Sequence, residues 1–398
     1  MKILIVSQHY WPEPMMTLTD ICEELVRRGH TVDVVTDIPN YPMGYIYEDY
    51  KHGKNRREEH NGVNIIRTFT IGRRHNAIFR LLNYYSYSFS STLYTLGLKD
   101  DYDVVFTNES SPVMMTRGAT AYSRKHHKQC IMYCMDLWPA CLAAGGMKEN
   151  SPLYKFFGKV SQKLYNRADT ILITSKMFRE YLEKEHGVPD EKIEYLPQYA
   201  AAQFDHIPDK DKKDGYDFVF AGNVGAAQSL DTVIKAAKIL KNDENWINIR
   251  WHIIGDGSEL QNLKQMAQGM DNVIFHGRKP IEDMPEYYAM ADAMLVLLLN
   301  DPLISLTLPG KVQTYMAAGK PILAAATGEI PLILDEAKCG WCTLPEDAEG
   351  FAKIVKQFIT YEQKETLGHN AREYYEQHFA RNQFMNKLEM RLIQAAEK

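Results

Sequence analysis

The stretch that decides the fold reads DFVFAGNVGAAQ from residue 217 to residue 228. Residues 217–221 form a largely apolar strand candidate, glycines follow at Gly222 and Gly225, and helical sequence starts near Ser229. Such a segment starts a Rossmann-like unit, because glycines let the backbone approach a ligand and the free N–H groups of a helix start favour a diphosphate. A merely tight turn would also explain the glycines.

Strand candidates alternate with helical sequence on both sides of this stretch. They lie at 2–6, 31–36, 63–66, 103–106, 130–133 and 170–173 before it, and at 249–254, 273–275, 293–297 and 321–324 after it. Strands that alternate with helices form parallel sheets covered on both faces. Two such arrays predict an α/β chain with two facing Rossmann-like domains and a cleft between them.

The border between the arrays is expected in the charged, apolar-poor run at 207–215. This gives a domain at 1–205, a second domain at 206–370 and a C-terminal helix at 371–398. The last segment lacks Pro and Gly and has helical periodicity, so we expect the helix to cross back onto the first domain. A terminal helix packed on the second domain is the alternative.

Composition narrows the class of protein. The chain has 398 residues and a net charge of -5, with no basic stripe of the kind that binds nucleic acid. It also lacks a run of about 20 apolar residues that could span a membrane, and its six cysteines show no disulfide spacing. These features predict a cytoplasmic protein. For the Cys339–Cys342 pair, a turn flanked by small apolar residues is preferred to a zinc or redox site.

The segment LPGKVQTYMAAGKP at 308–321 predicts a short helix. Pro309 suits its first turn, Gly319 its C-terminal cap, and Pro321 stops it. Lys311 then lies in the first turn, where the helix dipole disfavours a cation, which indicates that an anion shares the site. The alternative is a solvated surface lysine.

Two other patterns exclude chemistry rather than suggest it. The turn at 255–257 lacks the third glycine of a dinucleotide fingerprint, so we interpret it as structural. The Asp-x-Asp pairs at 101–103 and 209–211 lead into a strand and lie in the charged connection, respectively. We therefore predict no metal, and the charge of a diphosphate must be met by cations and helix N-termini.

Taken together, several motifs resemble family 4 retaining glycosyltransferases of the GT-B fold. The resemblance is closest to the N-acetyl-amino-sugar transferases of bacterial O-antigen, capsule and exopolysaccharide synthesis, and it spans nearly the whole chain. It rests on YWPEP at 10–14, DLWP at 136–139, GNVG at 222–225 with Gln228, GDG at 255–257, MADA at 290–293, PGK at 309–311, GKP at 319–321 and GE at 328–329.

The resemblance implies that the second domain binds a nucleotide sugar, UDP-linked and a substrate rather than a cofactor. The loop residues expected to contact this donor are Gly222, Asn223, Gly225, Gln228 and Gly310.

The first domain would bind a lipid-linked or saccharide acceptor, with contacts from Trp11, Pro12, Glu13 and Trp138. Asp136, just after a strand, is the candidate for positioning or deprotonating the acceptor hydroxyl. A helix cap is the alternative role for this aspartate.

The sequence departs from the family at two places. Leu306 and Thr314 stand where the family commonly has two glutamates, and Asn223 and Gln228 replace the cations of the first diphosphate loop. Contacts to the ribose and the sugar are therefore assigned to Thr307, Thr314 and Glu329. Lys311 and Arg278 are expected to carry more of the diphosphate charge, so that the catalytic candidates are Asp136, Lys311 and Arg278.

Two other functions remain open from the sequence. One is a sugar-nucleotide epimerase of similar shape, which would convert a donor without an acceptor. The other is a nucleotide-sugar-binding protein without catalysis, suggested by the missing glutamates.

The segment 73–98 suggests a membrane surface as a further partner. It begins with Arg73, Arg74 and His75 and continues as a stretch rich in aromatic and apolar residues. Cations would meet anionic lipid head groups on the inner face of the cytoplasmic membrane while the rings settle at the interface. A helix packed inside the first domain is the alternative.

Overall fold

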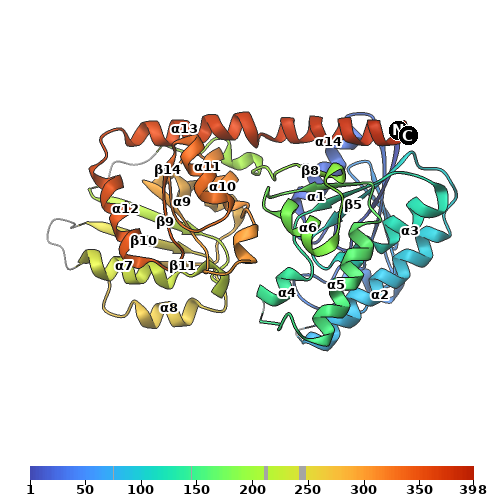
Figure 1. Cartoon of the computed structure of the whole chain (residues 1–398), viewed down its shortest axis with the longest axis horizontal. Coiled ribbons are helices and arrows are strands. Elements are labelled where there is room, and N and C mark those ends of the chain that lie inside the picture. Colours follow the sequence, from blue (N-terminus) through green and yellow to red (C-terminus); the bar gives the residue numbers. More distant parts are fainter. Residues whose placement is uncertain (75, 145, 210–213, 242–247) are drawn as a thin grey trace. The chain divides into compact units, whose positions relative to one another are not determined.

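The computed structural model describes residues 1–74, 76–144, 146–209, 214–241 and 248–398 (Figure 1). His75 of the expected docking segment and residues 210–213 of the expected border lie outside the described residues. The chain divides into two compact units. The first unit is Met1–Leu196 with Met385–Lys398, and the second unit is Pro197–Phe384.

The first unit is built on a sheet that has eight strands in the described part of the chain, in the order β3-β4-β2-β1-β5-β6-β7-β8. All neighbours pair in parallel except β3 with β4. The strands are β1 (Lys2–Val6), β2 (Thr31–Thr36), β3 (Arg57–His60), β4 (Val63–Arg67), β5 (Val104–Glu109), β6 (Cys130–Cys134), β7 (Thr170–Ile173) and β8 (Ile193–Tyr195).

Helices cover this sheet because helical connections join most of its parallel strands. Figure 1 shows α2 and α3 side by side, and these two helices make extensive contact. The central strands are buried on both faces, as their unbroken apolar runs predict. The α-helices are α1 (Met16–Arg27), α2 (Ala77–Leu96), α3 (Arg117–His126), α4 (Ala140–Ala144), α5 (Pro152–Tyr165) and α6 (Phe178–His186).

The second unit has a fully parallel sheet, with six strands among the described residues in the order β11-β10-β9-β12-β13-β14. Its strands are β9 (Tyr216–Ala221), β10 (Ile249–Ile254), β11 (Val273–Gly277), β12 (Ala293–Leu297), β13 (Ile322–Ala325) and β14 (Gly340–Thr343). Its helices are α7 (Asp231–Lys241), α8 (Leu260–Met266), α9 (Met284–Met290), α10 (Lys311–Ala317), α11 (Glu329–Ala337), α12 (Ala348–Thr360) and α13 (Lys364–His378). Apolar clusters pack on both faces of this sheet.

The C-terminal segment is two helices rather than one. α13 belongs to the second unit, where the Tyr375 hydroxyl accepts from Ala200 N at 3.2 Å. α14 (Arg381–Ala396) returns to the first unit from residue 385 on, and there Glu389 accepts from the Arg28 guanidinium at 2.6 Å. The expected return of the helix is present, but it starts later than residue 371.

The border between the units also differs from 205/206. Residues after Leu196 already pack on the second unit, where Ala200 and Phe204 join an apolar cluster and the Phe204 ring stacks on Tyr288 at 4.9 Å. The charged run therefore follows the border instead of forming it. No helix in the described ranges is both long enough and apolar enough to cross a membrane.

Strand order locates the candidate sites. Strands on either side of the β1/β5 pair, and of the β9/β12 pair, are reached by connections that run in opposite directions. Ligands of open parallel sheets bind at the carboxyl ends of strands beside such a switch point. The glycine loop follows β9, and the YWPEP motif follows β1.

Candidate active site

The glycine loop of the second unit is held in place by the turn after β10. Val224 N donates to Asp256 O at 2.9 Å, and Gly222 N donates to Ile254 O at 3.0 Å. A Cβ on Gly255, whose φ is +142°, would lie 1.8 Å from Gly222 O. The turn at 255–257 is thus structural, as the sequence indicates, and its structural role is to support the loop that is expected to bind the donor.

Lys311 lies against this loop. Its ammonium group donates to Gln228 Oε1, sits 4.0 Å from the centre of the Phe220 ring, and would be 3.2 Å from a Cβ on Gly222. Burial lowers the pKa of Lys311 to about 7. Because the side chain of Lys311 is held between an amide oxygen and an aromatic ring, it gains most from an anionic ligand.

The rest of α10 places further polar groups near Lys311. Gly310 precedes the helix, and the Thr314 hydroxyl donates to its carbonyl at 2.9 Å, so that this hydroxyl can only accept from a ligand. Gln313 is fully buried, and neither polar atom of its amide has a hydrogen-bond partner among the described residues. Sequence reasoning missed Gln313, although buried amides without partners often mark ligand or water sites.

The remaining donor candidates follow neighbouring strands. Glu329 is buried at the start of α11, directly after Gly328, on which a Cβ would lie 1.9 Å from Ser305 O. This close approach brings Glu329 to the loop that ends at the half-buried Thr307. Arg278 is exposed after β11, beside Gly277, whose carbonyl accepts from Gly255 N at 2.9 Å. Asn223 is exposed on the glycine loop, and its amide nitrogen lies 2.8 Å from the place of a Cβ on Gly225.

In the first unit, Asp136 and Glu109 form a pair of carboxyl groups at the ends of β6 and β5. Asp136 Oδ1 accepts from Leu137 N at 2.9 Å, and burial raises the pKa of Asp136 to about 6. Glu109 is fully buried and accepts from Ser111 N at 3.1 Å; burial and the Asp136 charge raise the pKa of Glu109 to about 8. At neutral pH, Asp136 is therefore ionised and Glu109 protonated. Both proposed roles of Asp136, cap and base, remain compatible with this geometry.

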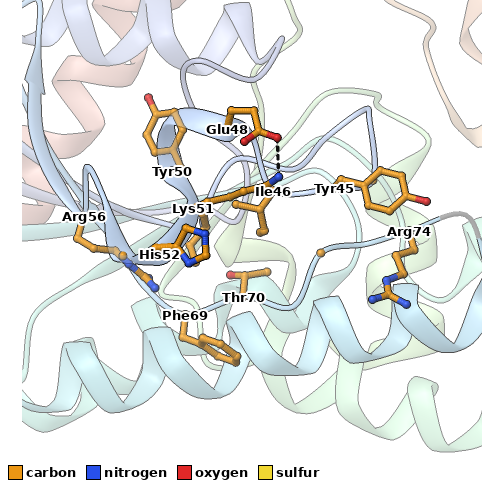
Figure 2. Close-up of a pocket in the computed structure, with 14 residues that line it drawn as sticks. Tyr45, Ile46, Glu48, Tyr50, Lys51, His52, Arg56, Phe69, Thr70 and Arg74 are labelled. Carbon is orange, nitrogen blue, oxygen red and sulfur yellow. Dashed lines mark hydrogen bonds and ion pairs between the residues drawn. The ribbon is translucent and has the colours of Figure 1, made fainter.

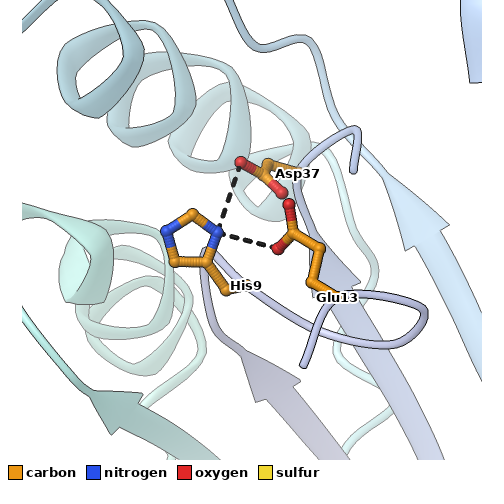
Figure 3. Close-up of side chains that lie close together, drawn as sticks. All are labelled: His9, Glu13 and Asp37. Carbon is orange, nitrogen blue, oxygen red and sulfur yellow. Dashed lines mark hydrogen bonds and ion pairs between the residues drawn. The ribbon is translucent and has the colours of Figure 1, made fainter. Parts of the chain in front are cut away.

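Figure 3 shows a second buried cluster, formed by His9, Glu13 and Asp37. Glu13 Oε2 lies 2.8 Å from His9 Nδ1, while Glu13 Oε1 accepts from the N–H groups of Asn40 and Tyr41 at 2.6 Å each. Both oxygens of this buried carboxylate have hydrogen-bond partners, so Glu13 orients His9, while its predicted contact with an acceptor stays a prediction.

The same cluster contains the residues that could hold a metal ion, one ligand atom from each side chain within 4.8 Å of the others. Burial and the Glu13 charge raise the pKa of Asp37 well above its ordinary value. A cation would have to displace this proton and the backbone donors of Glu13. The expectation that no metal takes part is therefore best tested directly.

The tryptophans of the two motifs differ in accessibility. Trp11 is half-buried, stacked on His60 at 3.9 Å with an angle of 14°, beside the half-buried Pro12. Trp138 is buried and packs edge-on against Tyr84 and Phe157. Its ring packs within the first unit and supports the loop, and its predicted contact with an acceptor stays a prediction.

Residues 16–198 match the family described as Glycosyltransferase Family 4, and residues 215–360 match the family described as Glycosyl transferases group 1. The chain is 28% identical to the glycosyltransferase WbjE of Pseudomonas aeruginosa over 57% of this chain and 59% of that protein. It is 24% identical to the colanic acid biosynthesis glycosyl transferase WcaI of Escherichia coli over 94% of this chain and 96% of that protein. The glycosyltransferase activity of both relatives is itself inferred.

Solved structures share the architecture. Sucrose-phosphate synthase from Thermosynechococcus elongatus aligns with a TM-score of 0.73 at 16% identity, covering 99% of this chain and 98% of that one. The Anabaena protein HepE, solved in complex with UDP, aligns with a TM-score of 0.69 at 15% identity, covering 99% of this chain and 100% of that one. At these identities the likeness shows the fold, which is GT-B. With a matching domain in each unit, the chain belongs to the glycosyltransferases, carrying a family 4 domain followed by a group 1 domain.

Proposed function

We propose that the chain transfers an N-acetylated hexosamine from a UDP-linked donor to a lipid-linked or saccharide acceptor, with retention, during cell-surface polysaccharide synthesis. The observation that carries the proposal is Lys311, a lysine whose pKa is lowered by burial and which a bound diphosphate would keep protonated, placed against the glycine loop at the β9/β12 switch point. The relatives named for colanic acid synthesis support the pathway class, and HepE bound to UDP supports the nucleotide.

In this mechanism, the bond between the anomeric carbon and the diphosphate oxygen breaks while a bond to the acceptor oxygen forms. Positive charge grows on the sugar ring, and negative charge grows on the leaving diphosphate, which Lys311 and the loop N–H groups stabilise. Arg278, exposed directly after β11, is the proposed second cation at the diphosphate.

The acceptor proton moves to the leaving diphosphate or to Asp136. Asp136 suits this role because its pKa of about 6 leaves it ionised at neutral pH, yet basic enough to accept a hydrogen bond from a hydroxyl group. Gln313, Thr314 and Glu329 are assigned to the ribose and the sugar. UDP then leaves, and no cofactor or metal is required.

We further propose that the protein works at the inner face of the cytoplasmic membrane, docked through α2. Large apolar side chains on this helix are exposed and lie three, four or seven residues apart, on one face. The helix contains no Asp or Glu, and Arg73, Arg74 and Arg80 lie at its start. This combination suits a surface of anionic lipids.

A donor panel tests the function. The protein is incubated with UDP- and GDP-linked sugars, with and without a membrane lipid or oligosaccharide extract as acceptor, and free UDP and GDP are measured. The proposal expects UDP release that depends on the acceptor and is greatest with a UDP-N-acetylhexosamine. A new sugar nucleotide formed without acceptor would indicate an epimerase, and binding without turnover would indicate a binding protein; either result contradicts the proposal.

A further inference from the structure

The first unit contains a cavity of about 590 Å³ that includes none of the residues assigned above to the donor, the acceptor or catalysis (Figure 2). Its walls are the segment after β2, including the 3-10 helix η1 (Glu48–Gly53), and the segment after β4. β2 and β4 are neighbours in the sheet, so the cavity lies at the carboxyl ends of strands, where such folds bind ligands. Its size falls within the range of small-molecule sites, roughly 300–1,000 Å³.

The charge of the cavity is positive. Lys51, Arg56 and Arg74 line it together with His52, against one carboxylate, Glu48, which pairs with Lys51. Figure 2 shows Arg56 and Arg74 at opposite sides of the cavity. Burial lowers the pKa of Arg56, whose guanidinium makes a long contact of 3.4 Å with Arg67 O. A cation in this position would gain from an anion, and arginines bind phosphate oxygens in a forked geometry.

The backbone around the cavity is closely packed. A Cβ on Gly44, whose φ is +80°, would lie 3.1 Å from Arg74 Cα, and one on Gly72 would lie 3.1 Å from Gly44 O. Arg74 N donates to Gly44 O at 2.7 Å. These contacts fix the position of Arg74 relative to the loop after β2, so the arginine lies on a defined wall rather than on a free loop.

The cavity lies beside the segment that connects β4 to α2, the helix with the exposed apolar face. Its wall is attached to this helix, because Ser90 Oγ donates to Phe69 O at 2.6 Å and Asn83 Nδ2 donates to Ile71 O at 2.8 Å. Phe69 and Tyr45 line the cavity and are themselves exposed. The exposed apolar side chains of α2 are Ile78, Leu81, Leu82, Phe89, Leu93 and Leu96.

We infer that this cavity binds the phosphate or diphosphate head of a membrane lipid whose chains contact the apolar face of α2. A free anion would need the cations but not the exposed aromatic rim beside them. A membrane surface alone would need the apolar face but not a hollow with an arginine on each side. The inference rests on the proposed transfer to a lipid-linked acceptor, and it places the acceptor's anionic head at Arg56 and Arg74.

Vesicle flotation tests the inference with two lipid mixtures of equal measured surface charge. One contains phosphatidylcholine with phosphatidic acid, whose head is a terminal phosphate; the other contains phosphatidylcholine with phosphatidylglycerol, whose phosphate is a diester. The full chain should bind the first mixture more tightly. Arg56→Gln and Arg74→Gln should each reduce this binding by roughly tenfold, the value of one charge-assisted hydrogen bond.

Arg57→Gln is the matched control, because Arg57 is exposed beside Arg56 but does not line the cavity. It should leave the preference for phosphatidic acid unchanged. Thermal unfolding and UDP binding of all three variants should match the parent, which separates a failure of this inference from a failure of the donor site. Inorganic pyrophosphate should displace the parent protein from phosphatidic acid vesicles.

Equal binding to both mixtures, or no vesicle binding by the parent protein, would overturn the inference. So would a loss of binding as large in Arg57→Gln as in Arg56→Gln, since that would show a general effect of charge. Pyrophosphate binding that requires Arg56 and Arg74, without any retention on vesicles, would assign the cavity to a soluble anion instead of a lipid.

Discussion

Glu109 and Asp136 are two carboxyl groups whose surroundings give them different charges at neutral pH. The pKa of Glu109 is raised to about 8 and that of Asp136 to about 6, in both cases chiefly by burial. The protonated Glu109 avoids a second negative charge beside Asp136 and keeps its hydrogen bond from Ser111 N. Asp136 thereby remains the group that can interact with an acceptor hydroxyl as a base.

The raised pKa of Glu109 predicts a pH-dependent stability. The ordinary value is 4.5 and the folded value is about 8, so between these pH values the folded chain keeps a proton that the unfolded chain has lost. The contribution of Glu109 to the free energy of unfolding therefore falls as pH rises through this window. Glu109→Gln, which cannot ionise, should remove this part of the decline and be more stable than the parent near pH 8.

Urea unfolding between about pH 5 and pH 8 measures this effect. Glu185→Gln, at an exposed position of α6, is the control and should follow the parent at each pH. Identical pH profiles for Glu109→Gln and the parent would show that Glu109 is already ionised in the folded chain.

Lys311→Ala should lower turnover with little change in stability. The lysine would contact the diphosphate most strongly as its charge grows, and such a contact is worth about 3 kcal/mol, roughly a hundredfold in rate. Because the side chain of Lys311 contacts an amide oxygen and an aromatic ring, removing it should change the free energy of unfolding by at most about 1 kcal/mol.

Lys235→Ala is the matched control for this variant, since Lys235 is a lysine of the same unit that forms an ion pair with Asp231. Steady-state UDP release at saturating donor is the measurement. If Lys311→Ala keeps more than about a third of the parent turnover, Lys311 does not stabilise the leaving diphosphate.

Sequence patterns identified some site residues better than others. The glycines and Lys311 could be placed because helix signals and turn chemistry are local. Burial of Glu13 and Trp138 could not be predicted from their motifs, because it depends on contacts with residues far along the chain, such as Asn40 and Phe157. Two further residues could have been identified from the sequence. Glu109 is a polar residue at the end of a buried strand, and Gln313 is an amide within an apolar helix face.

At the scale of elements, the turn after β10 and the loop after β9 act as one structure. Gly255→Ala should disrupt both, because its Cβ would overlap Gly222 O and its φ of +142° is strained for alanine. We expect a loss of stability of about 1–3 kcal/mol and a loss of UDP affinity of at least tenfold. Calorimetric titration with UDP and thermal unfolding measure the two effects.

Gly158→Ala is the control, since Gly158 lies within α5 and its Cβ would meet no atom within 4 Å. Alanine favours a helix over glycine, so this variant should be more stable by up to about 1 kcal/mol and bind UDP normally. UDP affinity unchanged in Gly255→Ala would show that the glycine loop does not hold the nucleotide.

Most strands of both sheets could be predicted because buried parallel strands are short apolar runs. β3 and β8 were missed since Arg57–His60 and Ile193–Tyr195 are brief and polar, as edge strands can be. β14 (Gly340–Thr343) starts directly after Cys339 and includes Cys342, where the sequence favoured a turn. The break between α13 and α14 contains no Pro or Gly and could not be predicted from the sequence. It arises because the two helices pack on the cores of different units.

At the scale of the whole molecule, both units place their polar residues at switch points of parallel sheets. The first unit has carboxylates and a histidine there, and the second has Lys311 and glycines. This division suits a neutral hydroxyl acceptor on the first unit and a diphosphate donor on the second. We expect the charge of the diphosphate to be met by protein cations rather than by a metal.

Turnover should therefore survive EDTA. UDP release measured after dialysis against EDTA should equal that of untreated protein, and His9→Gln should not change its response to added manganese. Activity that is abolished by the chelator and restored by manganese would instead assign a metal to His9, Glu13 and Asp37.

The central claim is that this chain joins a sugar from a nucleotide donor to an acceptor. The most direct test follows one labelled UDP-N-acetylhexosamine in a single reaction and measures both the UDP released and the label recovered on the acceptor. We expect the amount of UDP released to equal the amount of label on the acceptor, with no label in a new sugar nucleotide. Label that stays on UDP as a different sugar, or UDP release without labelled acceptor, would contradict it.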